Sequence, residues 1–385
     1  MVGPPKAQAT IVTSAWAPPV IGGTPSVMYE CLRHFPSGSF VLVTADMPGA
    51  SKDTRVLDAK TLLLPEDIRI RPLRFIWPPL VLAKRILLTL MFLKNQSVRP
   101  RNILAVYPSL DFIMMSLVLS KLLNLPLFVY FHDCLVETMN PDNRFFGRFV
   151  ERAVFRGAKK VYALSEPMRA FYAGKGYSMD VLPHGLDPRL VRSPSSANRS
   201  GTFSIGFAGA VYETNDKGIL DLLSAKKLIL DKPTIRIATA KVSMDRLSSL
   251  GAVKDVDVMT TPRTHDELLD FLAGCDVLFL PMNFESIYHD DLMTIFPTKV
   301  TDYWLAQRPV LAYGPDEYAF IRYASEQGFA LTVTKEGPEN IVRALEELRA
   351  SPALASSLTA SSKKMISIHD GAEVSRKLWA DLNSS

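Results

Sequence analysis

Two loops in the first half of the sequence carry residue types that bind anions and hydroxyl groups. The loop from Pro18 to Gly23 ends in Gly22 and Gly23, directly before a helical pattern. Glycine has no Cβ, so backbone amides at the start of a helix can approach a ligand, and such amides attract anions. The alternative is a tight turn that needs only the backbone conformations of glycine.

The second loop begins where an apolar run ends, with Phe131 followed by His132 and Asp133. In a doubly wound fold, the carboxyl ends of the strands face the ligand. We therefore expect His132 to contact a sugar hydroxyl or to stabilise charge. In the alternative interpretation Asp133 caps a helix, and His132 only packs beside it.

A third loop follows the apolar run 203–207 and contains Gly209, after which Asp216, Lys217 and Gly218 open a helix. Backbone amides together with the Lys217 ammonium predict a phosphate contact. The dinucleotide fingerprint G-x-G-x-x-G is absent. The alternative is that Lys217 is a solvated lysine at a helix start, because surface lysines are common.

The densest group of polar residues lies between 280 and 303. A strand ends, a loop with Glu285 follows, and Pro297 and Thr298 suit the start of a helix. Amides near Thr298 and Lys299 would point at an anion, with Lys299 adding positive charge. Asp302, one turn later, could accept hydrogen bonds from a ribose diol. The alternative is an ordinary Lys299–Asp302 pair on an exposed helix face.

Short apolar runs alternate with helical patterns along the whole chain, which predicts parallel sheets with crossover helices. Strands are expected at 9–14, 40–44, 103–106, 127–131, 160–163 and 180–182, and then at 203–207, 235–239, 257–259, 276–280, 310–312 and 330–332. Helices are expected at 26–35, 112–123, 144–155, 340–349 and 372–382. The carboxyl ends of these strands would bring the four polar loops to the sheet edges where ligands bind.

The apolar pattern stops at 188–202, where Ser, Pro, Arg and Asn predict a linker. The predicted fold class is α/β, with two tandem Rossmann-like doubly wound domains and an interdomain cleft. The expected parts are a first domain at 1–190, a linker at 191–202, a second domain at 203–368, and a C-terminal helix at 369–385 that packs back on the first domain.

Composition excludes several classes of protein. With 48% hydrophobic and 22% charged residues, the chain is expected to fold and not to be disordered. The net charge of +5 is too small to predict nucleic-acid binding. Three distant cysteines support neither a disulfide framework nor a zinc site, which favours a reducing, cytoplasmic location. We expect no secretory signal and no membrane span.

Taken in order, the motifs resemble retaining glycosyltransferases of the GT-B fold, similar to glycosyltransferase family 4, over nearly the whole chain. The resembling segments are PPVIGGTPSVMYECL, FHD, ALSEPM, VLPHGLD, IGFAGAVYETNDKG, CDVLFLPMNFES and FPTKVTDYWLAQRPVLAYG. The resemblance implies transfer of a sugar from a nucleoside diphosphate to an acceptor hydroxyl, with retained anomeric configuration and without a metal or other cofactor. It also implies that the first domain is the acceptor side and the second the donor side.

The resemblance implies roles for individual residues. Gly22 and Gly23 would lie against the donor phosphates, His132 would contact the donor sugar, and Lys217 would neutralise the diphosphate. Asp302 stands in the place of the family's acidic residue that holds the ribose hydroxyls. The complete donor-binding set is Gly22, Gly23, Gly209, Lys217, Glu285, Thr298, Lys299 and Asp302. The expected catalytic residues are His132, Lys217 and Lys299.

The sequence departs from the family pattern at two places. Ala210 replaces the family's arginine after the strand-end glycine, which removes one cation that Lys299 could replace. The usual E-x7-E pair is absent, because Thr294 occupies its first position and Glu285 lies on a longer loop. Asp255 and Asp257 offer a D-x-D pattern, but in a strand-like stretch, so no metal site is expected.

Residues 80–97 predict a broadly apolar helix with basic residues around it. These are Arg69, Arg71, Arg74, Lys84, Arg85, Lys94, Arg99 and Arg101. The pattern is typical of a helix on an anionic membrane surface, here the inner face of the membrane, and it would make the acceptor lipid-linked. The alternative is a helix buried within the first domain.

The leading hypothesis is therefore a hexosyltransferase that acts on a glycan or lipid-linked acceptor in polysaccharide or glycolipid assembly. One alternative is a GT-B sugar-nucleotide epimerase, in which water replaces the sugar acceptor. Another is a catalytically silent GT-B protein that binds nucleotide or glycan, favoured by Ala210 and the missing glutamate pair. Turnover of a nucleotide sugar distinguishes this last hypothesis from both enzymes.

Overall fold

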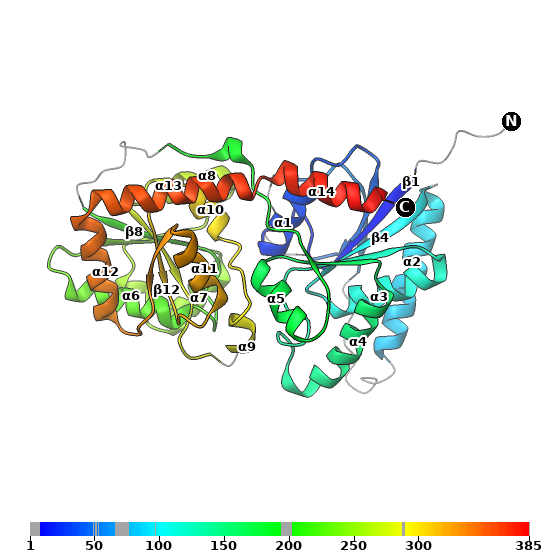
Figure 1. Cartoon of the computed structure of the whole chain (residues 1–385), viewed down its shortest axis with the longest axis horizontal. Coiled ribbons are helices and arrows are strands. Elements are labelled where there is room, and N and C mark those ends of the chain that lie inside the picture. The colour runs from blue at the N-terminus through cyan, green and yellow to red at the C-terminus, as the bar shows by residue number, and fades with distance from the viewer. Residues whose placement is uncertain are drawn as a thin grey trace. The chain divides into compact units, whose positions relative to one another are not determined.

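The computed structural model describes residues 8–48, 50, 52, 54–65, 77–96, 98–193, 202–286 and 289–384 (Figure 1). The chain forms two compact units. The first is Met1–Gly185 with Gly371–Ser385, and the second is Leu186–Asp370. The chain thus enters the second unit after Gly185. Most of the expected linker at 191–202 lies outside the described residues.

The first unit is built on a parallel sheet whose described strands have the order β3-β2-β1-β4-β5-β6-β7. The strands are β1 Gln8–Ser14, β2 Phe40–Ala45, β3 Lys60–Leu64, β4 Arg99–Tyr107, β5 Leu127–Phe131, β6 Lys160–Ala163 and β7 Asp180–Val181. The helices are α1 Gly23–Leu32, α2 Trp77–Asn95, α3 Leu110–Leu123, α4 Arg144–Gly157, α5 Glu166–Gly174 and α14 Gly371–Asn383, with a short 3-10 turn at Pro141–Asn143. The strand order reverses between β1 and β4, and ligands of doubly wound sheets bind beside such a reversal.

The second unit repeats this plan with the order β10-β9-β8-β11-β12-β13. Its strands are β8 Ser204–Ala208, β9 Thr234–Ala238, β10 Val258–Thr260, β11 Val277–Pro281, β12 Val310–Tyr313 and β13 Ala330–Val333. Its helices are α6 Asp216–Leu228, α7 Lys241–Ser249, α8 His265–Ala273, α9 His289–Leu292, α10 Val300–Leu305, α11 Ala319–Gln327, α12 Pro338–Ala350 and α13 Pro352–Ile368, with 3-10 turns at Pro188–Leu190 and Val253–Asp255. The reversal lies between β8 and β11, whose loops contain Gly209 and Glu285.

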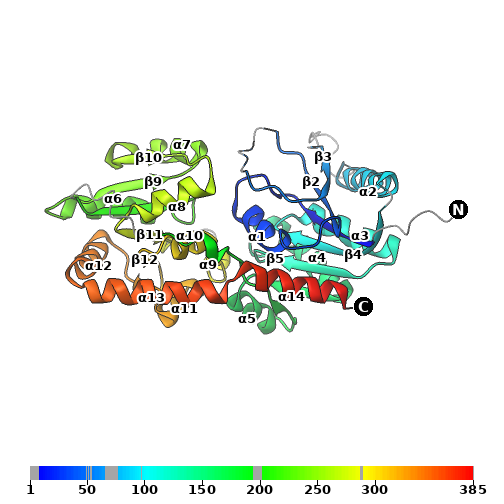
Figure 2. The ribbon, with the colours of Figure 1, turned by 90° about the horizontal axis from the view of Figure 1, so that it is seen from above.

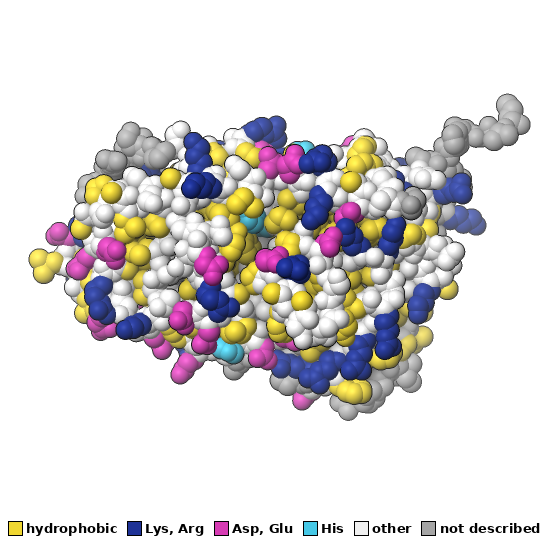
Figure 3. All heavy atoms as spheres, viewed as in Figure 1, with side chains coloured by type: hydrophobic (Ala, Val, Ile, Leu, Met, Phe, Trp, Pro, Cys, Tyr) yellow, Lys and Arg dark blue, Asp and Glu magenta, His cyan; other side chains and the backbone are white. Residues whose placement is uncertain are grey.

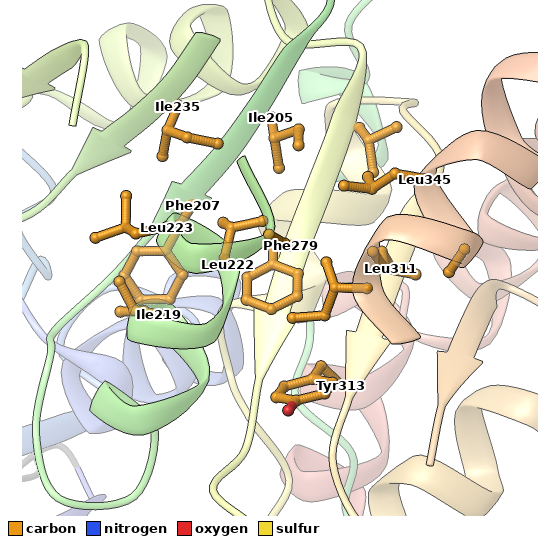
Figure 4. Close-up of a cluster of buried hydrophobic side chains, with 14 of the residues drawn as sticks. Ile205, Phe207, Ile219, Leu222, Leu223, Ile235, Phe279, Leu311, Tyr313 and Leu345 are labelled. Atoms are coloured by element: carbon orange, nitrogen blue, oxygen red, sulfur yellow. The ribbon is translucent and has the colours of Figure 1, made fainter. Parts of the chain in front are cut away.

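Apolar side chains from the strands and from two helices form the core of the second unit. Figure 4 shows Phe207 of β8 and Phe279 of β11 beside Ile219 of α6, with Leu345 of α12 on the same side of the sheet. Each of these four side chains is at most 1% exposed. Burying a side chain of this size stabilises a fold by about 1.5–3 kcal/mol. This packing holds the carboxyl ends of β8 and β11 in fixed positions.

The C-terminal helix α14 belongs to the first unit and lies beside α1 (Figure 2). Asn102 of β4 donates from Nδ2 to the Leu382 carbonyl at 2.6 Å. Lys160 and Tyr162 of β6 both reach Asp381 Oδ2 at 2.8 Å. Trp379 packs edge-on against Phe35, with ring centroids 4.8 Å apart. The last helix of the chain is therefore an integral part of the first unit's packing.

Helix α13 and strand β3 are two of the elements that were not predicted from the sequence. Helix α13 has the sequence PALASSLTASSKKMISI, in which Ala and Ser hide the apolar stripe, although Leu358, Met365 and Ile366 are buried. Strand β3 reads KTLLL and buries only Leu64 fully. Both are specified by contacts with neighbouring elements, because their own apolar periodicity is weak.

The helix expected at 80–97 is observed as α2, Trp77–Asn95. The helix is not fully buried, since Leu80, Leu87 and Met91 are more than half exposed. Arg69, Arg71 and Arg74, which were expected to flank it, lie outside the described residues. Among the helices that the structure describes, none has the length and apolar character needed to cross a membrane.

Candidate functional site

In the first unit, the glycine loop and the expected histidine lie next to each other. Gly22 is the N-cap of α1, and Thr24 lies in its first turn. His132 follows β5 directly, and its Nδ1 is 3.2 Å from Thr24 Oγ1 although 108 residues separate them. Sequence analysis missed Thr24; its position directly after two glycines at a helix start was the available signal.

The backbone at Gly22 does not require a glycine. Its φ is 164°, which is extended backbone that other residues also adopt. A Cβ there would lie 3.4 Å from Pro25 Cδ, an ordinary contact. The tight-turn interpretation is therefore wrong for Gly22. Approach of a ligand to the start of α1 stays a prediction.

His132 is a buried, uncharged imidazole. Burial, with a smaller contribution from neighbouring His184, lowers the pKa of His132 to about 3. Within the described part of the chain its Nε2 has no hydrogen-bond partner. A neutral ring can donate a hydrogen bond to a hydroxyl or accept one from it, but it carries no positive charge at pH 7. Hydroxyl contact fits this environment, and any charge stabilisation by His132 would come from a neutral N–H donor and not from an imidazolium.

Asp133 does not cap a helix. The residues after it form turns, and α4 begins only at Arg144. Burial raises the pKa of the Asp133 carboxyl to about 6. The alternative interpretation of this loop is therefore wrong, and Asp133 is an additional titratable group that sequence analysis did not select.

In the second unit, Lys299 crosses the end of β8. Its Nζ lies 4.5 Å from the centroid of the Phe207 ring. A Cβ placed on Gly209 would be 3.1 Å from Lys299 Cε and 3.2 Å from Nζ. Gly209 also has a φ of +127°, which residues with a side chain rarely adopt. Glycine is required at 209, because a side chain there would strain the backbone and would also crowd Lys299.

The Lys299 ammonium has no carboxylate or hydrogen-bond partner among the residues that the structure describes. Burial lowers its pKa to about 8, so most of it is still charged at pH 7. The electron-rich face of Phe207 stabilises it in part. Burying a cation that has no partner among the described residues is costly, and an anion beside it would offset that cost.

Asp302 is bonded to a histidine and not to Lys299. His265 Nε2, from the first residue of α8, lies 2.7 Å from Asp302 Oδ1. The expected alternative, a Lys299–Asp302 pair on an exposed face, is therefore wrong. Sequence analysis missed His265; the helix start at Thr264, whose side chain accepts from the Glu267 amide at 3.1 Å, was the available signal.

Side chains of the protein occupy the first amides of α6. The Lys217 amide donates to Asp216 Oδ1 at 2.8 Å, and the Gly218 amide donates to Asn283 Oδ1 at 3.1 Å. The expectation that these amides hold a phosphate is therefore wrong. Asn283, which is 1% exposed, was missed although it is the second residue after β11. Asp216 is itself held by Arg246 at 2.6 Å.

Lys217 and Glu285 lie close together. The Lys217 Nζ is 3.6 Å from Glu285 Oε2, and both side chains are more than half exposed. Two of the expected donor-binding residues, 68 positions apart, thus share one surface beside the ends of β8 and β11. A surface pair of this kind is weak, about 0–1 kcal/mol, so it would open readily for a charged ligand.

The helix expected to begin at Pro297 and Thr298 begins instead at Val300, with Lys299 as its N-cap. The Val300 amide donates to the Pro297 carbonyl at 3.0 Å. Thr298 lies in the preceding turn, and its carbonyl accepts from Thr301 Oγ1 at 2.8 Å. The positive charge of this segment therefore comes chiefly from the Lys299 side chain.

The D-x-D pattern is occupied by lysines. Lys227 Nζ lies 2.9 Å from Asp255, and Lys226 Nζ lies 2.6 Å from Asp257. Within the described residues there is no group of three or more His, Cys, Asp or Glu side chains placed to hold a metal ion. The three cysteines are buried, and none forms a disulfide within the described residues.

No protein-family model and no curated protein matches the chain. Solved structures do resemble it. HepE from Anabaena, solved with UDP and glucose, has a TM-score of 0.73 at 14% identity, covering 98% of this chain and 99% of that one. Sucrose-phosphate synthase from Thermosynechococcus elongatus has a TM-score of 0.74 at 14% identity, covering 97% and 100%.

WaaG, described as a glycosyltransferase involved in lipopolysaccharide biosynthesis, has a TM-score of 0.65 at 13% identity, covering 98% of this chain and 100% of that one. These similarities extend over the full length of both chains. They confirm the predicted fold class, two Rossmann-like domains of the GT-B type. At this level of identity they establish the fold and not the family.

Proposed function

We propose that the protein is a retaining glycosyltransferase, similar to family 4, that takes a sugar from a nucleoside diphosphate donor. The observation that carries this proposal is Lys299, an ammonium held against the end of β8 with no carboxylate partner among the described residues. A diphosphate would supply the missing negative charge. HepE, which shares the fold, was solved with UDP and glucose.

Lys299 would also take the place of the family's arginine, which Ala210 replaces in this sequence. Its Nζ lies 3.2 Å from the position of a Cβ on Gly209, the residue before Ala210. Lys299 would thus supply a cation at the end of β8. Lys217, on the surface beside the same strand ends, would add a second positive charge when it leaves Glu285.

The proposed reaction needs stabilisation of a departing diphosphate. The acceptor oxygen forms a bond to the anomeric carbon on the face from which the phosphate leaves. The bond from that carbon to the phosphate oxygen breaks, its electron pair stays on the phosphate, and this oxygen takes the acceptor's proton. Lys299 and Lys217 stabilise the developing charge. The chemistry requires no protein nucleophile, and protein cations take the place of a metal.

Uncharged and acidic groups would hold the sugars. His132 Nε2, buried and with no hydrogen-bond partner in the described part of the chain, is suited to a hydroxyl of the donor sugar. Gly22 and Gly23 would admit the donor phosphates to the start of α1. Asp302, oriented by His265 at 2.7 Å, would accept from the ribose hydroxyls. Thr298, Gly209 and Glu285 would complete the donor contacts.

The proposed acceptor is a glycan or a lipid-linked sugar in polysaccharide or glycolipid assembly. We assign the acceptor to the first unit and the donor to the second. The proposed location is the cytoplasm, peripheral to the inner face of an anionic membrane. This location is supported by α2, which exposes Leu80, Leu87 and Met91 together with Lys84 and Lys94.

The test is release of nucleoside diphosphate from UDP-, GDP-, ADP- and TDP-sugars, with and without lipid acceptors. We expect slow hydrolysis of one donor by the natural protein, lost in Lys217→Ala and in Asp302→Ala and unchanged in Lys232→Ala. Lys232 is exposed and lies two residues before β9, at the amino end of that strand and not at a carboxyl end, so it is the matched control. If a donor binds and no acceptor or water ever leads to turnover, a nucleotide-binding role replaces the proposal.

A further inference from the structure

Helix α4 has an outer face with an unusual composition. Its buried positions are Gly147, Val150, Glu151 and Val154, which follow the spacing of one helix face. On the other side, Phe145 is 85% exposed, Phe149 67% and Phe146 45%. Large aromatic side chains are rarely left so exposed three at a time on one helix without a partner.

The same outer face is strongly basic. Arg148, Arg152 and Arg156 are exposed at helical spacing from Phe145 and Phe149. The described residues provide none of these three guanidinium groups with a carboxylate or a hydrogen-bond acceptor. Glu151, the single acidic residue of α4, is buried on the inner side, 3.5 Å from Lys175 Nζ. Phe145, Phe146, Phe149, Arg148, Arg152 and Arg156 are called the α4 face below.

The helix itself is held firmly, so its exposed side is not the result of loose attachment. A Cβ on Gly147 would lie 2.5 Å from Met139 Sδ, which shows how closely the backbone of α4 packs on the preceding turns. Arg144 adds hydrogen bonds from its side chain to the carbonyls of Met139 and Glu137, both at 3.4 Å. The α4 face is therefore presented in one orientation.

Charge and apolar surface occur together around α4 beyond the helix itself. Helix α3 contacts both α4 and α2, so the three form one layer on the sheet of the first unit. Figure 3 shows Lys and Arg side chains gathered at the lower edge of the first unit, where Figure 1 labels α4, with hydrophobic side chains beside them.

We propose that the α4 face docks the protein on an anionic lipid bilayer. The phenylalanines would enter the boundary between head groups and acyl chains, and the arginines would bind lipid phosphates. Charge complementarity favours an anionic membrane, because three guanidinium groups with no acceptor among the described residues stand at helical spacing from the aromatic rings. This inference rests on the proposed membrane location and makes it more specific. It names α4, and not α2, as the main contact with the membrane.

The test is flotation of the full-length protein with vesicles of phosphatidylcholine alone or with 30% phosphatidylglycerol. We expect binding to the anionic vesicles only, weakened by 500 mM salt. Each arginine near the surface is worth about a fivefold change in partitioning, so Arg148→Gln/Arg152→Gln/Arg156→Gln should lower binding about 100-fold. Phe145→Ser/Phe149→Ser should lower it at least tenfold.

Two control variants separate the possible contacts. Leu87→Ser/Met91→Ser removes exposed apolar groups from α2, and Leu228→Ser/Leu230→Ser removes them from the second unit, where both residues are exposed. We expect small losses from the α2 variant and none from the second. Unchanged binding in both α4 variants, or a larger loss in the α2 variant, would overturn the proposal.

The membrane contact and the proposed enzyme activity can fail independently. All of these substitutions are at exposed positions, so donor hydrolysis without vesicles and the unfolding temperature should stay unchanged. If the natural protein does not float with any vesicle, the membrane contact is wrong whatever the hydrolysis assay shows. A change in oligomeric state of the α4 variants without any vesicle binding would make the α4 face a protein interface instead.

Discussion

Each unit has a basic side chain near the end of a strand, and the two differ in their charge at pH 7. His132 follows β5 in the first unit, and Lys299 lies across the end of β8 in the second. Burial lowers the pKa of both, to about 3 for His132 and to about 8 for Lys299. Because the two start from 6.5 and 10.5, the same physical effect leaves an uncharged ring in one unit and a cation in the other.

This difference suggests a division of tasks. A neutral imidazole can select among sugar hydroxyls by hydrogen bonding, and it does not compete for the phosphates. A cation that has lost part of its hydration interacts strongly with a diphosphate. Among the described residues, His132 Nε2 in the first unit and Lys299 Nζ in the second have no hydrogen-bond or carboxylate partner, and both lie near the carboxyl end of a strand, which is where ligands of this fold class bind.

The largest effect is expected from Lys299→Met, which keeps the volume of the side chain and removes its charge. Removal of a charge-stabilising group from an active site lowers turnover by about 10²–10³-fold. Release of nucleoside diphosphate from the accepted donor measures this. Lys232→Met, at an exposed position, is the control and should behave like the natural protein. Equal turnover in the Lys299→Met and control proteins would remove Lys299 from the mechanism.

A pair of glycine substitutions tests the difference between the two loops. Gly209→Ala forces a side chain into φ +127° and against Lys299, so we expect it to destabilise the protein by about 1–3 kcal/mol. Gly22→Ala meets only an ordinary contact at 3.4 Å, so its stability should change by less than about 0.5 kcal/mol. Urea unfolding of both variants measures this. Similar losses in the two would mean that the loops do not differ as described.

A smaller effect is expected from pH. Lys299 loses its proton as pH rises through about 8, so kcat/KM for the donor should fall about tenfold by pH 9. His132 stays neutral above about pH 3, so it should add no step between pH 5 and 8. Lys299→Met should lack the step near pH 8. A step near pH 6.5 that disappears in His132→Asn would show that the imidazole is charged in the working protein.

The linkage to folding has the same origin and a definite sign. Between about pH 8 and 10.5 the unfolded lysine binds more protons than the folded one, so the Lys299 contribution to stability rises with pH. For His132 the corresponding window is about pH 3 to 6.5, and stability falls as pH falls through it. Asp133 acts in the opposite direction, because its pKa is raised to about 6.

Much of the fold could be predicted. The strands at 127–131 and 160–163 match β5 and β6, because strongly apolar runs bounded by polar residues are local signals. Helix α13 and strand β3, which were not predicted, lack such a signal. For the site, Lys217 and Glu285 were selected separately and are found 3.6 Å apart. The partners His265, Asn283 and Thr24 were missed, since each belongs to a different element from the residue it contacts.

The succession of strands and helices along the chain could be predicted from the sequence, and with it the loops that follow the strands. These are local properties, set by apolar periodicity and by glycine and proline at the ends of elements. The chemistry of those loops depends on the folded structure. There Asn283 accepts from the Gly218 amide of α6, His265 is hydrogen-bonded to Asp302, and Lys299 is buried with no carboxylate partner among the described residues. Protonation and pairing depend on desolvation and on distances between residues far apart in the chain, and no local pattern encodes these.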